Sequence, residues 1–259
     1  MHPNLRFLAG ILDFLIPSSC PLCEDALPSF GGRTVCAPCM EKLERTSPPW
    51  CPRCGKPFLS QMTLAYSPDH LCADCREHPP AYDRARALGP MEGGLRDLIH
   101  LFKFEGKSGL ADALAPALGG LARAEFPETA GDGSALVTYV PIHPARWRER
   151  GFDQAQILAR RTAAWLDLPF EKTLERRRET PPQTGLPAAR RRSNLRGAFG
   201  VIAAGRIAGK RTLLLDDVLT TGSTASACAR ALKGAGALSV EVLTVCHVPF
   251  RGAGMRPVR

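Results

Sequence analysis

The chain has no apolar run long enough to cross a membrane. Its N-terminal stretch LRFLAGILDFLIP, residues 5–17, is interrupted by Arg6 and Asp13, whereas a membrane span needs about 20 consecutive apolar residues. Asp13 also breaks the uncharged core that a signal peptide requires. We therefore interpret residues 1–19 as an amphipathic helix that packs on the rest of the protein, and we expect a cytoplasmic protein that is not transmembrane.

Aromatic residues are scarce, and acidic residues are fewer than basic ones. Aromatic side chains make up 7% of the 259 residues and are not interleaved with the basic runs, which argues against an extended base-stacking platform for nucleic acid. The 34 Lys and Arg residues exceed the 25 Asp and Glu residues, for a net charge of +9. Such an excess favours anionic partners, among them nucleic acid, phosphorylated metabolites and acidic membrane surfaces. Binding of a nucleic-acid backbone stays open.

Cysteine is rare after residue 75, and eight of the ten cysteines precede that point as four CxxC pairs separated by 12, 11 and 17 residues. Two such pairs can complete one tetrahedral shell of four sulfurs around zinc. The repeat therefore predicts two structural zinc ions, and pairing of neighbours gives two zinc ribbons in series. The predicted ligands are Cys20, Cys23, Cys36 and Cys39 for the first ion, and Cys51, Cys54, Cys72 and Cys75 for the second. An interleaved pairing would use the same residues and stays open.

Two alternatives to zinc are less consistent with the pattern. A disulfide framework would require secretion, and no export signal is present, whereas redox chemistry normally uses one CxxC motif in place of four. Residues 20–78 contain little apolar sequence, so metal binding would supply most of their stability. We interpret His70 and His78 as bystanders, and Cys228 and Cys246 as small buried apolar residues.

The remainder of the chain alternates between strand and helix patterns. After a proline-containing linker at 76–83, we expect strands at 84–89, 135–144, 211–218 and 239–248, and helices at 93–106, 109–125, 153–166 and 223–236. Asp153 is a suitable N-cap for the third helix. This alternation predicts an α/β domain over residues 84–250 with a mainly parallel sheet. Residues 170–199 carry two triple-arginine runs around a Pro-Gly-rich stretch, and we expect a mobile basic loop there.

The segment LLLDDVLTTGST, residues 213–224, predicts an anion site. An apolar strand ends on Asp216 and Asp217 and is followed by a turn of small residues that leads into a helix. In a parallel sheet, ligands bind beyond the carboxyl ends of the strands, and converging amides at a helix N-terminus suit a phosphate. The loop can add hydroxyl donors from Thr220, Thr221, Ser223 and Thr224. The two carboxylates would repel that phosphate, so we expect them to face ribose hydroxyls or a metal ion.

This segment closely resembles the phosphoribosyl pyrophosphate (PRPP) signature of type I phosphoribosyltransferases. Residues 140–159, VPIHPARWRERGFDQAQILA, resemble the pyrophosphate-loop region of that family in the form seen in ComF proteins, and residues 183–199, QTGLPAARRRSNLRGAF, resemble its mobile-loop motif. With the double zinc ribbon upstream, the whole chain is identified as a member of the ComF family. The resemblance implies a type I phosphoribosyltransferase-like parallel sheet flanked by helices, preceded by a small double zinc-ribbon module.

The resemblance also implies roles for individual residues. Asp216 and Asp217 would hold the ribose hydroxyls of PRPP, and Mg²⁺ would accompany PRPP. The 5-phosphate would bind at Thr220, Thr221, Gly222, Ser223 and Thr224. Candidates for the leaving pyrophosphate are Arg146, Arg148, Arg150 and Arg191, of which the motif match favours Arg150 and Arg191. The expected catalytic residues are therefore Asp216, Asp217, Arg150 and Arg191.

Two departures from better-known relatives are visible. Hypoxanthine-guanine enzymes carry an acid that assists proton transfer where this chain has Thr220, so we do not expect purine salvage of that type. The chain also continues little past its last strand, so no C-terminal cover for a nucleobase is evident. Either the zinc ribbon or residues 91–125, with Lys103 and Lys107, would have to cover the site.

Three classes of function remain open. The chain is a PRPP-using transferase with an unidentified acceptor, a PRPP-binding protein without turnover, or a protein that binds single-stranded DNA. The name ComF refers to competence, so the resemblance implies a link to DNA uptake in natural transformation, with single-stranded DNA or competence proteins as partners. For the Asp-Asp and Thr-Gly run alone, an unrelated phosphate-binding loop is the alternative, but three family motifs in order argue against it.

Overall fold

The computed structural model describes residues 19–27, 34–58, 60, 67–178, 195 and 197–249. The amphipathic helix expected at residues 1–19 lies outside these ranges except for Ser19. No helix within them is both long and apolar enough to span a membrane.

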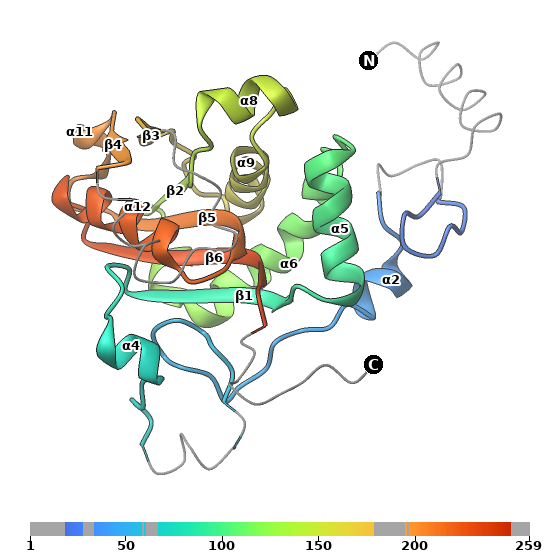
Figure 1. Ribbon diagram of the computed structural model, residues 1–259, viewed down its shortest axis with the longest axis horizontal. Helices are drawn as coiled ribbons and strands as arrows, with labels where there is room; N and C mark the ends of the chain where they lie inside the picture. The colour runs from blue at the N-terminus through green and yellow to red at the C-terminus, as the bar shows by residue number, and fades with distance from the viewer. Residues whose placement is uncertain are drawn as a thin grey trace.

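A four-stranded parallel sheet forms the centre of the molecule, in the order β1-β6-β5-β2 (Figure 1). Its strands are β1 (Arg84–Pro90), β2 (Leu136–Tyr139), β5 (Arg211–Leu219) and β6 (Ser239–His247). The four strands expected from the sequence are thus confirmed. Strand β2 is shorter than expected because Pro141 has no amide to donate to a ladder, and the chain turns away after Val140 donates to the Leu215 carbonyl oxygen at 2.9 Å.

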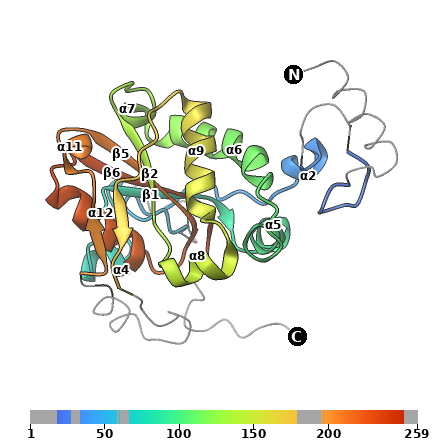
Figure 2. The ribbon, with the colours of Figure 1, turned by 90° about the horizontal axis from the view of Figure 1, so that it is seen from above.

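Helices cover both faces of the sheet, as Figure 2 shows. On one face lie α5 (Gly93–Phe104), α6 (Leu110–Glu125) and α9 (Gln154–Leu166), and on the other lies α12 (Ser223–Gly234). Alternate residues of β5 point to opposite sides, so Leu213 and Leu215 join the core under α6 and α9 while Leu214 joins the core under α12. These four helices are also confirmed.

Several short elements were not expected. They are α7 (Pro127–Ala130), α8 (Pro144–Arg150), α11 (Ala204–Ile207), and an antiparallel pair of β3 (Leu174–Arg176) with β4 (Phe199–Val201). The expectation of a loop throughout 170–199 is therefore wrong at its two ends, where buried Leu174 and Phe199 anchor the hairpin. Three-residue strands are too short to produce a detectable alternation. The arginine runs between the strands lie outside the described residues.

We call the described cysteine-bearing residues 19–27, 34–58, 60 and 67–78 the zinc module. It contains two short helices, α2 (Ala37–Glu41) and α4 (Ala73–Glu77), which begin directly after Cys36 and Cys72. The module covers the edge strand β1, since Ala85 donates its amide to the Arg53 carbonyl oxygen at 2.8 Å and Thr46 donates to that of Leu88 at 2.9 Å. Covering a strand edge in this way fixes the module to the sheet and blocks edge pairing with other chains.

Candidate functional site

The eight cysteines form two separate groups. In each group the four Sγ atoms lie within 4.8 Å of one another, and the groups are Cys20, Cys23, Cys36, Cys39 and Cys51, Cys54, Cys72, Cys75. The Cys23 and Cys36 sulfurs are 3.7 Å apart, and those of Cys54 and Cys72 are 3.6 Å apart. A zinc tetrahedron with bonds of about 2.3 Å separates its sulfurs by roughly 3.8 Å, whereas a disulfide joins them at about 2.05 Å. The spacing fits zinc, and the pairing is the one in series.

Backbone amides support both groups of thiols. Cys36 donates its amide to the Cys20 sulfur and Cys72 donates to the Cys51 sulfur, each at 3.5 Å, and such donors stabilise metal-bound thiolates. Within the described residues, neither His70 nor His78 belongs to a group of potential metal ligands. The distant Cys228 and Cys246 are fully buried, as expected from the sequence.

Zinc content gives a direct test of this arrangement. The purified protein should contain about two zinc ions per chain, and Cys72→Ser should reduce this to about one because three sulfurs no longer complete the second shell. Elemental analysis by plasma mass spectrometry measures the content. Cys228→Ala is the matched control and should retain both ions. An unchanged content in Cys72→Ser would show that the second group does not bind zinc.

At the carboxyl end of β5, two carboxylates meet a lysine from another element. Asp217 donates its amide to Asp216 Oδ1 at 2.8 Å, and Asp217 Oδ2 forms an ion pair with Lys103 Nζ at 2.7 Å. Lys103 belongs to the last turn of α5, and the side chains of Lys103 and Asp217 are only 20% and 14% exposed. Lys107, which we grouped with Lys103, instead pairs with Glu105 at 3.2 Å. Helix α5 thus places one positively charged side chain, that of Lys103, beside the acidic pair.

Burial strongly perturbs the acids of this region. It raises the pKa of the Asp216 carboxyl well above its usual range, and the charge of Asp217 raises it further. Burial and, to a smaller extent, the charge of Asp217 also raise the pKa of Asp153, which accepts hydrogen bonds from the amides of Ile142 at 3.0 Å and Gln156 at 3.2 Å. The sequence identified Asp153 as the N-cap of α9, which is confirmed, but its place beside the diacid depends on how α9 crosses the sheet.

The raised pKa of Asp216 predicts a stability cost. A carboxyl whose pKa is higher in the folded state makes its full contribution to the free energy of unfolding below its pKa in the unfolded chain, which is about 3.9. This contribution is lost as pH rises through the folded-state pKa. Asp216→Asn should therefore increase the free energy of unfolding at pH 8, and the gain should shrink towards pH 5. Urea denaturation of the zinc-loaded protein measures it.

Asp132→Asn provides the control for that experiment. Asp132 is exposed and its pKa is lowered, mainly by a hydrogen bond from the Ser134 amide, so its replacement should bring no gain in stability. If Asp216→Asn were destabilised at every pH, the carboxylate would be stabilising in the free protein and our electrostatic interpretation would be wrong.

The loop after the diacid joins β5 to α12. Gly222 adopts a left-handed conformation with φ of 71°, and a Cβ there would lie 2.7 Å from the Tyr82 hydroxyl, so the position requires glycine. No side chain caps α12 through its N-cap residue, and the Thr221 and Ser223 hydroxyls are 2.8 Å apart. The loop thus presents hydroxyls and a helix N-terminus together. Thr224 is the second residue of α12.

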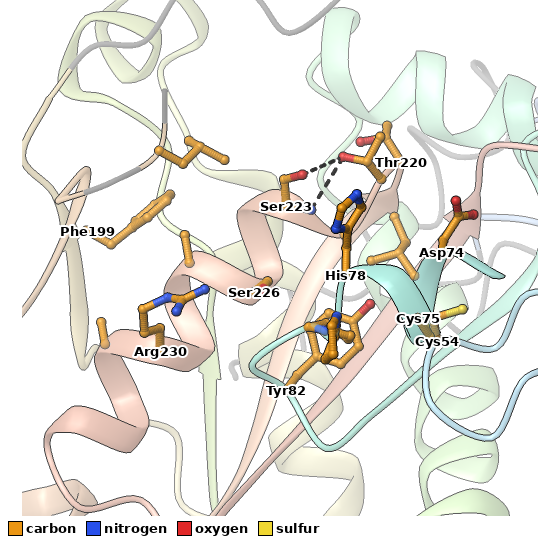
Figure 3. A pocket seen from close by; sticks show the side chains of 18 of the residues that line it. Cys54, Asp74, Cys75, His78, Tyr82, Phe199, Thr220, Ser223, Ser226 and Arg230 are labelled. Carbon is orange, nitrogen blue, oxygen red and sulfur yellow. Dashed lines mark hydrogen bonds between the residues drawn. The ribbon is translucent and has the colours of Figure 1, made fainter. Parts of the chain in front are cut away.

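A cavity of about 1060 Å³ begins at this loop and runs between α12, β4 and the zinc module (Figure 3). Thr220, Thr221, Gly222 and Ser223 line it, whereas Asp216, Asp217 and Thr224 do not. The module contributes Cys54, Cys75 and His78, and the far part is lined by Phe199, Ser226 and Arg230. Of the two segments that we expected to cover the site, the zinc ribbon lines this cavity and residues 91–125 do not. The other walls could not be predicted, because they come from segments that are distant along the chain.

The candidate arginines are placed only in part. Arg150 is the last residue of α8, which follows β2 at the same edge of the sheet as the diacid, but its side chain lies outside the described part of the structure, as does all of Arg191. Arg146 and Arg148 also belong to α8. Residues 144–150 are thus helical and follow β2, the strand that pairs with β5.

Comparison with known proteins places these features in a family. A model described as "Double zinc ribbon domain" matches residues 11–76, and one described as "Phosphoribosyl transferase domain" matches residues 149–258. "DNA utilization protein YhgH" of Escherichia coli K12 is 31% identical over 234 residues, which cover 90% of this chain and 98% of the relative. "Competence protein F" of Haemophilus influenzae is 30% identical over 217 residues, covering 80% and 88%. "Competence protein ComFC" of Streptococcus pneumoniae is 27% identical over 214 residues, covering 82% and 86%.

Proposed function

The chain belongs to the ComF family, which joins a double zinc ribbon to a phosphoribosyltransferase domain, and on this premise we propose that it binds Mg²⁺–PRPP at the carboxyl end of β5. One observation carries the proposal: Asp216 and Asp217 lie near the carboxyl end of β5, which ends at Leu219 and is followed by a glycine loop that opens onto a helix N-terminus. A sugar phosphate needs such a combination, because its hydroxyls donate to carboxylates while its phosphate accepts from amides and hydroxyls.

Different residues bind different groups of PRPP. Asp216 and Asp217 accept hydrogen bonds from the ribose hydroxyls, and the loop of Thr220, Thr221, Gly222 and Ser223, together with Thr224 at the start of α12, binds the 5-phosphate. Lys103 offsets the charge of Asp217, which would otherwise oppose the approach of an anionic ligand. We assign Arg150 and Arg191 to the pyrophosphate, where guanidinium groups can bind two oxygens at once.

Magnesium would be held largely by the ligand. Among the described residues, the only groups of three or more potential metal-binding side chains are the two cysteine groups, so the protein offers no carboxylate cage for Mg²⁺ there. This fits an ion held by one or two carboxylates and by substrate phosphates. When bound, Mg²⁺ neutralises charge on the leaving pyrophosphate.

The acceptor side of the site differs from that of purine salvage. Thr220 lines the cavity and is exposed, and a hydroxyl cannot transfer a proton at a purine as a carboxylate can. If turnover occurs, it is pentosyl transfer to another acceptor, and PRPP binding without turnover is the alternative. The names of the relatives, DNA utilization and competence, support a role in handling DNA, and we place that role in the cytoplasm. Single-stranded DNA or competence proteins are then the partners that we propose.

Titration calorimetry of zinc-loaded protein with Mg²⁺–PRPP tests the site. The parent should bind, and Asp216→Asn/Asp217→Asn should bind at least tenfold more weakly, because a hydrogen bond to a charged group such as Asp217 contributes about 1.5–3 kcal/mol. Asp132→Asn is the control and should bind as the parent does. Equal affinity of the parent and the double variant would contradict the proposal, and no binding by a folded parent would shift attention to single-stranded DNA.

A further inference from the structure

The cavity beside the phosphate loop is larger than a phosphate site requires. Binding sites for whole small molecules enclose about 300–1,000 Å³, and this cavity measures about 1060 Å³. The phosphate loop lines it but the ribose-binding acids do not. The cavity therefore extends from the loop of residues 220–223 on the side away from Asp216 and Asp217.

We propose that this cavity is a second subsite, which binds a nucleotide attached to the 5-phosphate of the ribose held at the diacid. The inference rests on the proposed function and deepens it. The ligand class is a ribose with free 2- and 3-hydroxyls whose 5-phosphate continues as a diphosphate to a nucleoside.

Donors along α12 suit the second phosphate. The cavity is lined by Ser223, Ser226 and Arg230. Because Ser226 follows Ser223 by three residues and Arg230 follows it by seven, the three side chains lie on one face of the helix. Arg230 is exposed and, within the described residues, makes no hydrogen bond or ion pair. Seven residues of helix span about 10 Å, which gives a diphosphate and its sugar room to extend along α12. Figure 3 shows this face, with Ser223 at one end and Arg230 towards the other.

Aromatic and apolar walls suit a nucleobase. Phe199 from β4 and Tyr82 from the segment after α4 line the cavity on different sides (Figure 3). Both side chains are largely buried, so they supply an apolar wall for the edge of a base and not a stacking face.

The acidic residues of the cavity are confined to α4. Asp74 and Glu77 belong to that helix, and Asp74 is paired with Lys56 at 3.2 Å. An anionic ligand is therefore directed towards α12, where the donors lie.

Competition against Mg²⁺–PRPP tests the subsite, with ADP-ribose and ribose 5-phosphate as probes. ADP-ribose carries the diphosphate and the nucleoside, so it should displace PRPP at about tenfold lower concentration than ribose 5-phosphate. Arg230→Gln should remove this advantage and leave the affinities for PRPP and ribose 5-phosphate unchanged. Arg206→Gln changes an exposed arginine of α11 outside the cavity and should retain the advantage.

The outcomes separate the two proposals. If PRPP binds and ADP-ribose competes no better than ribose 5-phosphate, the phosphate loop does not accept an esterified phosphate and the second subsite is wrong. An advantage of ADP-ribose that survives Arg230→Gln would also overturn the assignment to α12. If PRPP itself does not bind, the proposed function fails, and the subsite fails with it.

Discussion

The contact between Lys103 and Asp217 links the two halves of the site. Two adjacent carboxylates at the end of a buried strand repel each other, and the protein limits this cost in two ways: burial favours the neutral form of Asp216, and Lys103 compensates Asp217. The lysine can do so only if α5 is held in place. Leu22 and Leu43 of the zinc module lie against Gly94 at the start of α5, and Figures 1 and 2 both show α2 beside this helix. The first zinc ribbon thus helps to position a residue at the far end of α5.

The second zinc ribbon forms part of the wall of the cavity beside α12. Its Cys54 and Cys75 line the cavity that begins at the loop between β5 and α12, and Tyr82, just after the module, lies against Gly222. Metal binding stabilises a segment that has little apolar core of its own, and this segment forms a wall that the sheet and its helices do not supply. We therefore regard the zinc module as a part of the proposed ligand site.

Local patterns in the sequence predicted the elements with long periodicity and the motifs with fixed spacing. The four sheet strands, their four long helices and the two cysteine groups follow from alternation, periodicity and CxxC repeats, and the glycine turn between β5 and α12 follows from its run of small residues. Contacts between distant segments could not be predicted in this way. The ion pair of Lys103 with Asp217, the approach of Asp153 to the diacid and the cavity walls all depend on how helices cross the sheet. The β3–β4 hairpin was missed because three residues carry too little pattern.

A double-mutant cycle of Lys103→Met and Asp217→Asn tests most directly whether α5 and the acidic strand form one site. The unfolding free energy of the parent, both single variants and the double variant would be measured in urea. The account predicts that the double variant loses less stability than the sum of the single variants, with a coupling of about 1 kcal/mol or more, because either single change leaves an unpaired charge in a largely buried position. Additivity within about 0.5 kcal/mol would show that the two residues are independent and would contradict the account.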